Sequence, residues 1–136
     1  MEIRRLGPRD DQALEAAVRA FRGFEIHPDP AFLADPRSFA YVALDGETVV
    51  GFAWGAELPQ PAGGSLDLLV GLEVADAVRQ HGVGTELLRA FVAGARGAGA
   101  TKMWMLTDAG QRAAKLLYED APSAGGEGLG PWWVMA

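Results

Sequence analysis

The stretch that decides the fold is Leu72-Glu73-Val74-Ala75-Asp76-Ala77-Val78-Arg79-Gln80-His81-Gly82-Val83-Gly84-Thr85. It completes an apolar run over residues 65–74 that is typical of a β-strand, and a helical pattern of apolar residues follows Gly82. Small glycines before a helix leave main-chain N–H groups uncovered, and the positive end of the helix dipole adds to their attraction for anions. The stretch therefore predicts a phosphate or pyrophosphate site, and with it a cofactor-binding enzyme.

The rest of the chain alternates between strand and helix patterns. Strands are predicted over residues 3–6, 39–44, 48–57, 65–74, 102–107 and 132–135, and helices over residues 10–22, 31–35, 83–97 and 109–120. The pair Asp45-Gly46 is a hairpin signal, and the strands it joins are apolar on both faces. This order predicts one α/β domain over residues 1–136 with a mixed, mostly antiparallel sheet, helices on both faces and a parallel pair around the helix that follows Gly82.

Composition excludes several classes of protein. The chain has 136 residues, a formal net charge of −6 and no cysteine, which argues against nucleic-acid binding and rules out disulfides and thiolate metal sites. With only two histidines, no metal site is expected. No apolar run approaches the ~20 residues of a membrane span, and the N-terminus lacks a signal-peptide pattern, so we expect a cytoplasmic protein without membrane contact. The acidic charge mildly favours cationic ligands.

Together these features resemble the GNAT superfamily of acetyl-coenzyme A-dependent N-acetyltransferases. The sharpest match is the family's motif Arg/Gln-x-x-Gly-x-Gly/Ala, met by Arg79, Gly82 and Gly84 just after the 65–74 strand. Leu117-Tyr118-Glu119 is similar to a second family segment. Residues 32–58 and the spacing from Asp108 to Tyr118 are most similar to the aminoglycoside 3-N-acetyltransferase type I group.

The resemblance implies acetyl-CoA as co-substrate, without a metal. Its pyrophosphate is expected on the N–H groups of Gly82, Val83, Gly84 and Thr85, while Arg79 either adds charge or holds the turn. The main chain of Leu72, Glu73 and Val74 is expected to pair with the pantetheine arm. By resemblance Tyr118 gives a proton to the departing thiolate, a step suited to a phenol with an ordinary pKa of about 10.

Gly71 predicts a β-bulge, since glycine inside a strand often marks one. Such a bulge would splay the sheet between its fourth and fifth strands, make room for the thioester and free an N–H group to polarise its carbonyl. It would also reverse the facing of Asp67 and Glu73, which simple alternation puts on one side. The family often places a glutamate base where this chain has Leu68; the neighbouring Asp67 is our candidate base, and Glu73 is a second carboxylate.

Acceptor recognition is less well defined by the sequence. Glu25 and His27, in a Pro-rich segment, and Asp108, at a strand end, are the predicted acceptor-binding residues. The segment Pro122-Ser123-Ala124-Gly125-Gly126 replaces a Gly-Phe pair of the family and leaves the sixth strand open. Trp132-Trp133 on a terminal strand makes a homodimer plausible.

The predicted function is acetyl transfer from acetyl-CoA to a primary amine of a small molecule, with an aminoglycoside as one candidate, by direct attack in a ternary complex. Two alternatives stay open. One is acetylation of a protein lysine or N-terminus. The other is a module that binds acyl-CoA without turnover, which the missing strand glutamate and the altered tail keep under consideration.

Overall fold

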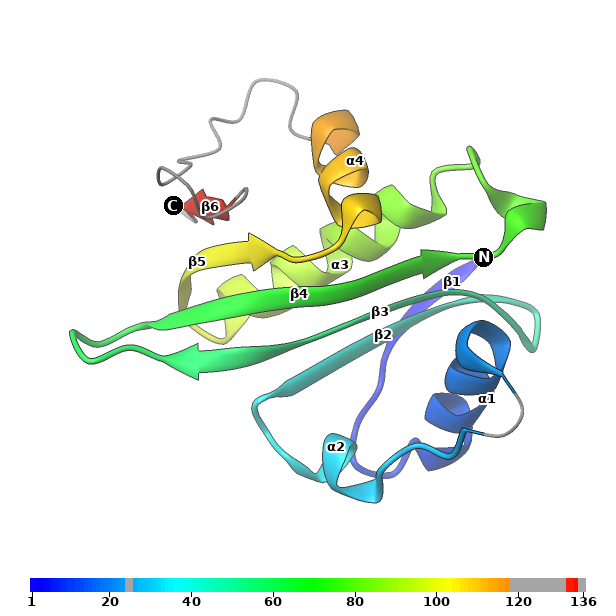
Figure 1. Ribbon diagram of the computed structural model, residues 1–136, viewed down its shortest axis with the longest axis horizontal. Coiled ribbons are helices and arrows are strands. Elements are labelled where there is room, and N and C mark those ends of the chain that lie inside the picture. The colour runs from blue at the N-terminus through cyan, green and yellow to red at the C-terminus, as the bar shows by residue number, and fades with distance from the viewer. Residues whose placement is uncertain (24–25, 118–131, 135–136) are drawn as a thin grey trace.

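The computed structural model describes residues 1–23, 26–117 and 132–134, and the sheet at its centre has the order β1-β2-β3-β4-β5-β6 (Figure 1). The strands are β1 (Glu2–Arg5), β2 (Ser38–Asp45), β3 (Thr48–Pro59), β4 (Ser65–Val74), β5 (Ala100–Met105) and β6 (Trp132–Val134). The helices are α1 (Asp11–Arg22), α2 (Pro30–Ala34), α3 (Val83–Gly97) and α4 (Asp108–Leu117), with a short 3-10 turn, η1 (Asp76–Val78), before α3.

All neighbouring strands are antiparallel except β4 and β5, which are parallel and joined through α3. The prediction of a mixed, mostly antiparallel sheet is therefore confirmed. The sixth strand, which the altered tail left open, is present and pairs with β5, with Met103 opposite Trp133.

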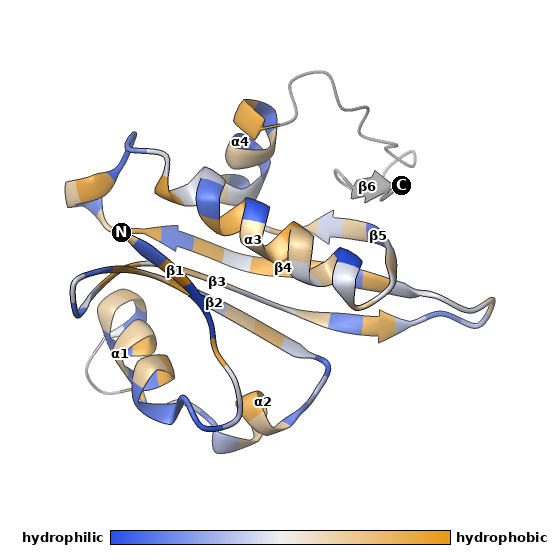
Figure 2. Ribbon diagram, turned by 180° about the vertical axis from the view of Figure 1, so that it is seen from behind, coloured by the Kyte–Doolittle hydropathy of each residue, from blue (hydrophilic) through white to orange (hydrophobic). Residues whose placement is uncertain are grey.

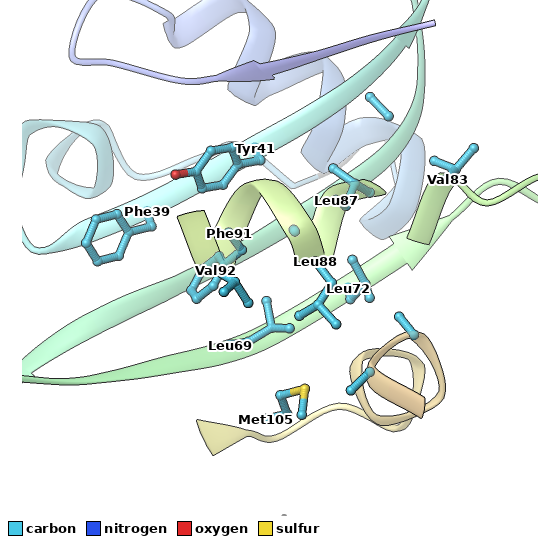
Figure 3. Packing of buried hydrophobic residues seen from close by; sticks show 14 of the residues in the cluster. Phe39, Tyr41, Leu69, Leu72, Val83, Leu87, Leu88, Phe91, Val92 and Met105 are labelled. Atoms are coloured by element: carbon cyan, nitrogen blue, oxygen red, sulfur yellow. The ribbon is translucent and has the colours of Figure 1, made fainter. Parts of the chain in front are cut away.

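Helices cover both faces of the sheet, as the two-faced apolar hairpin predicts. On one face α3 packs its predicted apolar stripe (Leu87, Leu88, Phe91, Val92 and Ala95) against the middle strands, and α4 lies beside it (Figure 3). On the other face α1 and α2 contribute Leu14, Ala17 and Leu33 to a second core (Figure 1). Hydrophobic and hydrophilic segments alternate along the helices on both sides of the sheet (Figure 2).

A β-bulge interrupts β4 where the sequence predicts one. Gly71 lies opposite Trp54 and Leu69 opposite Gly55, so Val70 is the extra residue. The position requires glycine because the Trp54 indole lies where a Cβ of residue 71 would be. The Trp54 ring is held from the other side by an edge-on contact with Phe32, at 6.0 Å between centroids.

The bulge has two consequences. Leu69 and Leu72 both enter the core under α3, so simple alternation along the strand, which puts them on opposite faces, is wrong beyond Val70. The strands also splay: pairing of β4 with β5 ends at Leu69 and Met105, followed only by the bond from Leu106 N–H to the Leu69 carbonyl at 2.8 Å. The last part of β4 therefore has no neighbour on its β5 side among the described residues.

Candidate active site

A cavity of about 730 Å³ lies where β4 and β5 part. It is bounded by the end of β4, the turn into α3 and one face of α4, with Phe21 of α1 at its other side. Its lining includes all eight residues predicted to hold the cofactor: Leu72, Glu73, Val74, Arg79, Gly82, Val83, Gly84 and Thr85.

The turn into α3 presents free main-chain donors to this cavity. The first helical bond runs from the Glu86 N–H to the Gly82 carbonyl at 3.0 Å, so the N–H groups of Val83, Gly84 and Thr85 precede it. No described side chain caps this helix end. An anion in the cavity would therefore meet unsatisfied donors at the positive end of the helix dipole.

The two motif glycines are required for different reasons. Gly82 has φ of 80°, a left-handed conformation that glycine adopts without strain, and it follows Gln80, also left-handed with φ of 68°. Gly84 has no such constraint, and a Cβ there would make only ordinary contact with Val74 Cγ2 at 3.6 Å. The fold therefore needs glycine at 82, whereas at 84 glycine keeps the cavity open.

Two arginines line the cavity. Arg79 is paired with Asp76 at 2.9 Å while its side chain stays 69% exposed, so it braces the turn and still faces solvent. Arg112 was not predicted. It lies on the face of α4 that also brings Ala109, Ala113 and Leu116 to the cavity. This spacing of three and four residues is the sequence signal that could have found it.

The open edge of β4 offers main-chain groups to the cavity. The Ala75 N–H donates to the Val50 carbonyl at 2.9 Å, and Val74 lies opposite Gly51 in the same register. Because hydrogen-bonded and non-bonded positions alternate along an antiparallel pair, the main chains of Leu72 and Val74 point away from β3. The main chain of Glu73 points toward β3, which corrects the expectation that it pairs with the pantetheine arm. Only the side chain of Glu73 is left to contact a ligand.

That side chain lies on the α1 side of the sheet. Its Oε1 is 3.4 Å from Nη2 of Arg22, and its Oε2 is buried without a hydrogen-bond partner among the described residues. Asp67 faces the opposite side, in line with Leu69, so the predicted reversal of facing between the two carboxylates is confirmed.

Asp67 does not line the cavity. It is fully buried, and neither carboxylate oxygen has a partner among the described residues. Burial, with a smaller contribution from Glu57, raises the pKa of Asp67 to about 6, and Arg5 opposes the shift. The candidate base therefore has a pKa suited to proton transfer, but a proton from the cavity could reach it only through a relay such as ordered water.

The other predicted residues are not gathered at the cavity. Asp108 is exposed at the first turn of α4, beside the lining residue Ala109, and His27 is exposed ahead of α2. Glu25 and Tyr118 lie outside the described residues.

Over residues 1–23, 26–117 and 132–134, no three histidine, aspartate or glutamate side chains gather as a metal site would require. In the same part of the chain, none of the helices has the length and apolar character needed to span a membrane.

Comparison with known proteins identifies the family of this chain and the solved structures that share its fold. A family model described as the acetyltransferase (GNAT) family matches residues 10–121. No curated protein sequence matches the chain.

Among solved structures, an aminoglycoside acetyltransferase from an uncultured soil metagenomic sample, in complex with sisomicin, has a TM-score of 0.75 at 20% identity, over 99% of this chain and 96% of that one. A second aminoglycoside acetyltransferase from such a sample has a TM-score of 0.71 at 22% identity, over 94% and 93%. A ribosomal-protein-alanine N-acetyltransferase from Brucella melitensis biovar Abortus 2308 has a TM-score of 0.69 at 19% identity, over 94% and 95%. At these identities the likeness concerns the fold alone.

Proposed function

This chain belongs to the GNAT family of acetyltransferases, and from that premise we propose that it transfers the acetyl group of acetyl-CoA to a primary amine of a small molecule. The observation that carries the proposal is the single cavity surface that joins the uncapped start of α3 to the unpaired edge of β4. The two parts suit the two ends of one elongated ligand, a charged pyrophosphate and an amide-containing arm.

The residues present fit coenzyme A. The N–H groups from Val83 to Thr85 would bind the pyrophosphate, with Arg79 and Arg112 adding positive charge. The main-chain edges of Leu72 and Val74 would pair with the amides of the pantetheine arm as a neighbouring strand does. Gly84 leaves the space that a phosphate needs against the helix.

When bound, acetyl-CoA supplies an activated acetyl thioester. The work of the chain is to align it with the amine in one ternary site, where proximity and orientation provide much of the rate gain. The bulge at Val70 ends the pairing with β5 and so leaves room for the thioester between the strands.

The proposed transfer also needs one group that accepts a proton and one that donates a proton. The acceptor amine must lose a proton before or during attack, and the thiolate must gain one. Asp67, through a relay, is the proposed acceptor of the first proton, and Tyr118, at the residue after the described part of α4, is the proposed donor of the second.

A thiol-release assay with acetyl-CoA tests the function. We expect release with small amines, and the panel should contain aminoglycosides, including sisomicin because of the solved relative, together with polyamines, amino acids and peptides. Release with peptides alone would favour acetylation of a protein, and acetyl-CoA binding without release across the panel would favour a non-catalytic acyl-CoA module.

A further inference from the structure

The cavity reaches both faces of the sheet. Arg112 and Ala113 belong to α4 on one face, whereas Phe21 belongs to α1 on the other face (Figure 1). All three residues line the same cavity. This is a direct result of the splay, since β4 and β5 are no longer paired beyond Leu69.

The two sides of the cavity differ in charge. Arg79, Arg112 and the start of α3 make the α3–α4 side attractive to anions. Glu73 is the one carboxylate among the described lining residues, and its ion pair with Arg22 sets it on the α1 side, from which Phe21 also lines the cavity. A ligand on that side would meet a carboxylate and an aromatic ring, a combination that favours an ammonium group.

Glu73 is incompletely satisfied. Its single described partner, Arg22, is 3.4 Å away, beyond the usual hydrogen-bond range of roughly 2.7–3.2 Å. Its Oε2 is buried without a partner among the described residues, an arrangement that costs free energy until a donor arrives. Arg22 is 49% exposed, so it can turn into solvent when another cation takes its place.

We infer that Glu73 binds a second ammonium group of the acceptor while a different amine of the same molecule is acetylated, and that Arg22 occupies Glu73 until this acceptor enters. The inference rests on the proposed function and narrows its substrate class to molecules with at least two amines. An ammonium held by a carboxylate stays protonated and cannot attack, so the group at Glu73 is the anchor and not the nucleophile.

The test compares linear diamines with monoamines of matched shape. Acceptors from 1,3-diaminopropane to 1,6-diaminohexane are each paired with the monoamine in which a methyl group replaces one amine. At saturating acetyl-CoA we expect the best diamine to exceed its monoamine in kcat/KM by about tenfold, the gain from one charged hydrogen-bonded contact.

Glu73→Gln should lower kcat/KM for the diamines about tenfold more than for the monoamines and so abolish this preference, because the amide carries no charge to hold an ammonium group. Arg22→Ala should increase the preference, because the competing cation is gone. Arg19→Ala is the matched control: Arg19 lies on the same helix but is paired with Glu15, and neither residue lines the cavity.

A diamine preference that survives Glu73→Gln would overturn the inference. An equal fall in kcat/KM for diamines and monoamines would also overturn it, because it would indicate that Glu73 acts as a base and not as an anchor. Binding of the same diamines to the protein saturated with CoA, measured by calorimetry, decides the question without turnover. Absence of thiol release with every amine would refute the proposed function. In that case, diamine binding that weakens in Glu73→Gln would still support the anchor, whereas diamine binding that does not depend on Glu73 would refute the anchor as well.

Discussion

Gly82 and Gly84 show at the level of single residues how a motif combines needs of the fold with needs of a ligand. Gly82 is held in a left-handed conformation, whereas Gly84 sits in the first turn of α3 with space for a Cβ against Val74. Under the proposed function, ligand binding and stability impose opposite demands at position 84.

Gly84→Ala should leave the fold intact and raise its stability by about 0.5–1 kcal/mol, since alanine is the better helix residue. It should also weaken acetyl-CoA binding at least tenfold, because the added methyl group occupies the space of a phosphate. Thermal unfolding and calorimetry measure the two effects. Gly97→Ala, at the other end of α3 with open space around it, should change stability without changing affinity. Unchanged acetyl-CoA affinity in Gly84→Ala would refute the phosphate site.

Tyr118→Phe tests the proton donor that the family resemblance assigns. Loss of the hydroxyl should lower kcat roughly 10²–10⁴-fold, the usual contribution of a positioned acid, while acetyl-CoA affinity stays unchanged. Single-turnover kinetics with direct binding separates the two quantities. A variant with the parental kcat would remove Tyr118 from the mechanism.

At the scale of elements, strand β4 determines where the sheet opens to form the cavity. Its first half is held between β3 and β5, and its second half is held by β3 alone. The bulge at Val70 separates these halves, and the Trp54 indole over Gly71 maintains it. The opening in the sheet thus depends on a contact between a glycine and a tryptophan on neighbouring strands.

Gly71→Ala should destabilise the protein by about 1–3 kcal/mol, the usual cost of added volume in a packed site. Chemical denaturation provides the measurement. The double variant with Trp54→Leu should recover part of the loss if the clash is its cause, because the two sites are in contact and their effects do not add. Equal stability of Gly71→Ala and the parent protein would show that Trp54 does not constrain this position.

At the scale of the whole molecule, a buried carboxylate links stability to pH. Asp67 has its pKa raised from 3.8 to about 6, so the folded state binds its proton more tightly than the unfolded chain does. This contribution to stability is complete below about pH 4, falls as the pH rises through about 6 and is absent above it.

Asp67→Asn should therefore gain stability relative to the parent as the pH rises. The gain between pH 4 and pH 7.5 is expected to be on the order of 3 kcal/mol, from about 1.36 kcal/mol for each pKa unit. Denaturation at both pH values measures it. Glu47→Gln, on an exposed turn, serves as the control. A stability difference that does not vary with pH would mean that Asp67 is already ionised without cost. Turnover of the variant reports separately on its proposed role as base.

The order and type of the elements were predictable because local sequence determines them. The 3.6-residue spacing of Leu87, Leu88 and Phe91 indicated a buried helix face, and Asp45-Gly46 indicated a hairpin. The motif from Arg79 to Thr85 was also local, and its backbone groups lie in one turn whatever the rest of the chain does. That is why the five predicted cofactor residues of this turn line one cavity.

Tertiary structure decided which side chains face the motif from Arg79 to Thr85 across the cavity. Arg112, Phe21 and Arg22 reach the site from α4 and α1, and no spacing along the chain relates them to β4. The bulge turned Glu73 toward α1, whereas Asp67, which precedes the bulge, faces the opposite side and is buried, because one extra residue reverses which side chains face which side of a sheet. By itself, then, the sequence determined the element order and the turn that we propose as the site of the acyl donor, whose binding groups belong to nearby residues of the chain. Only the tertiary structure decided which charged side chains line the proposed acceptor side of the cavity, since those come together by packing.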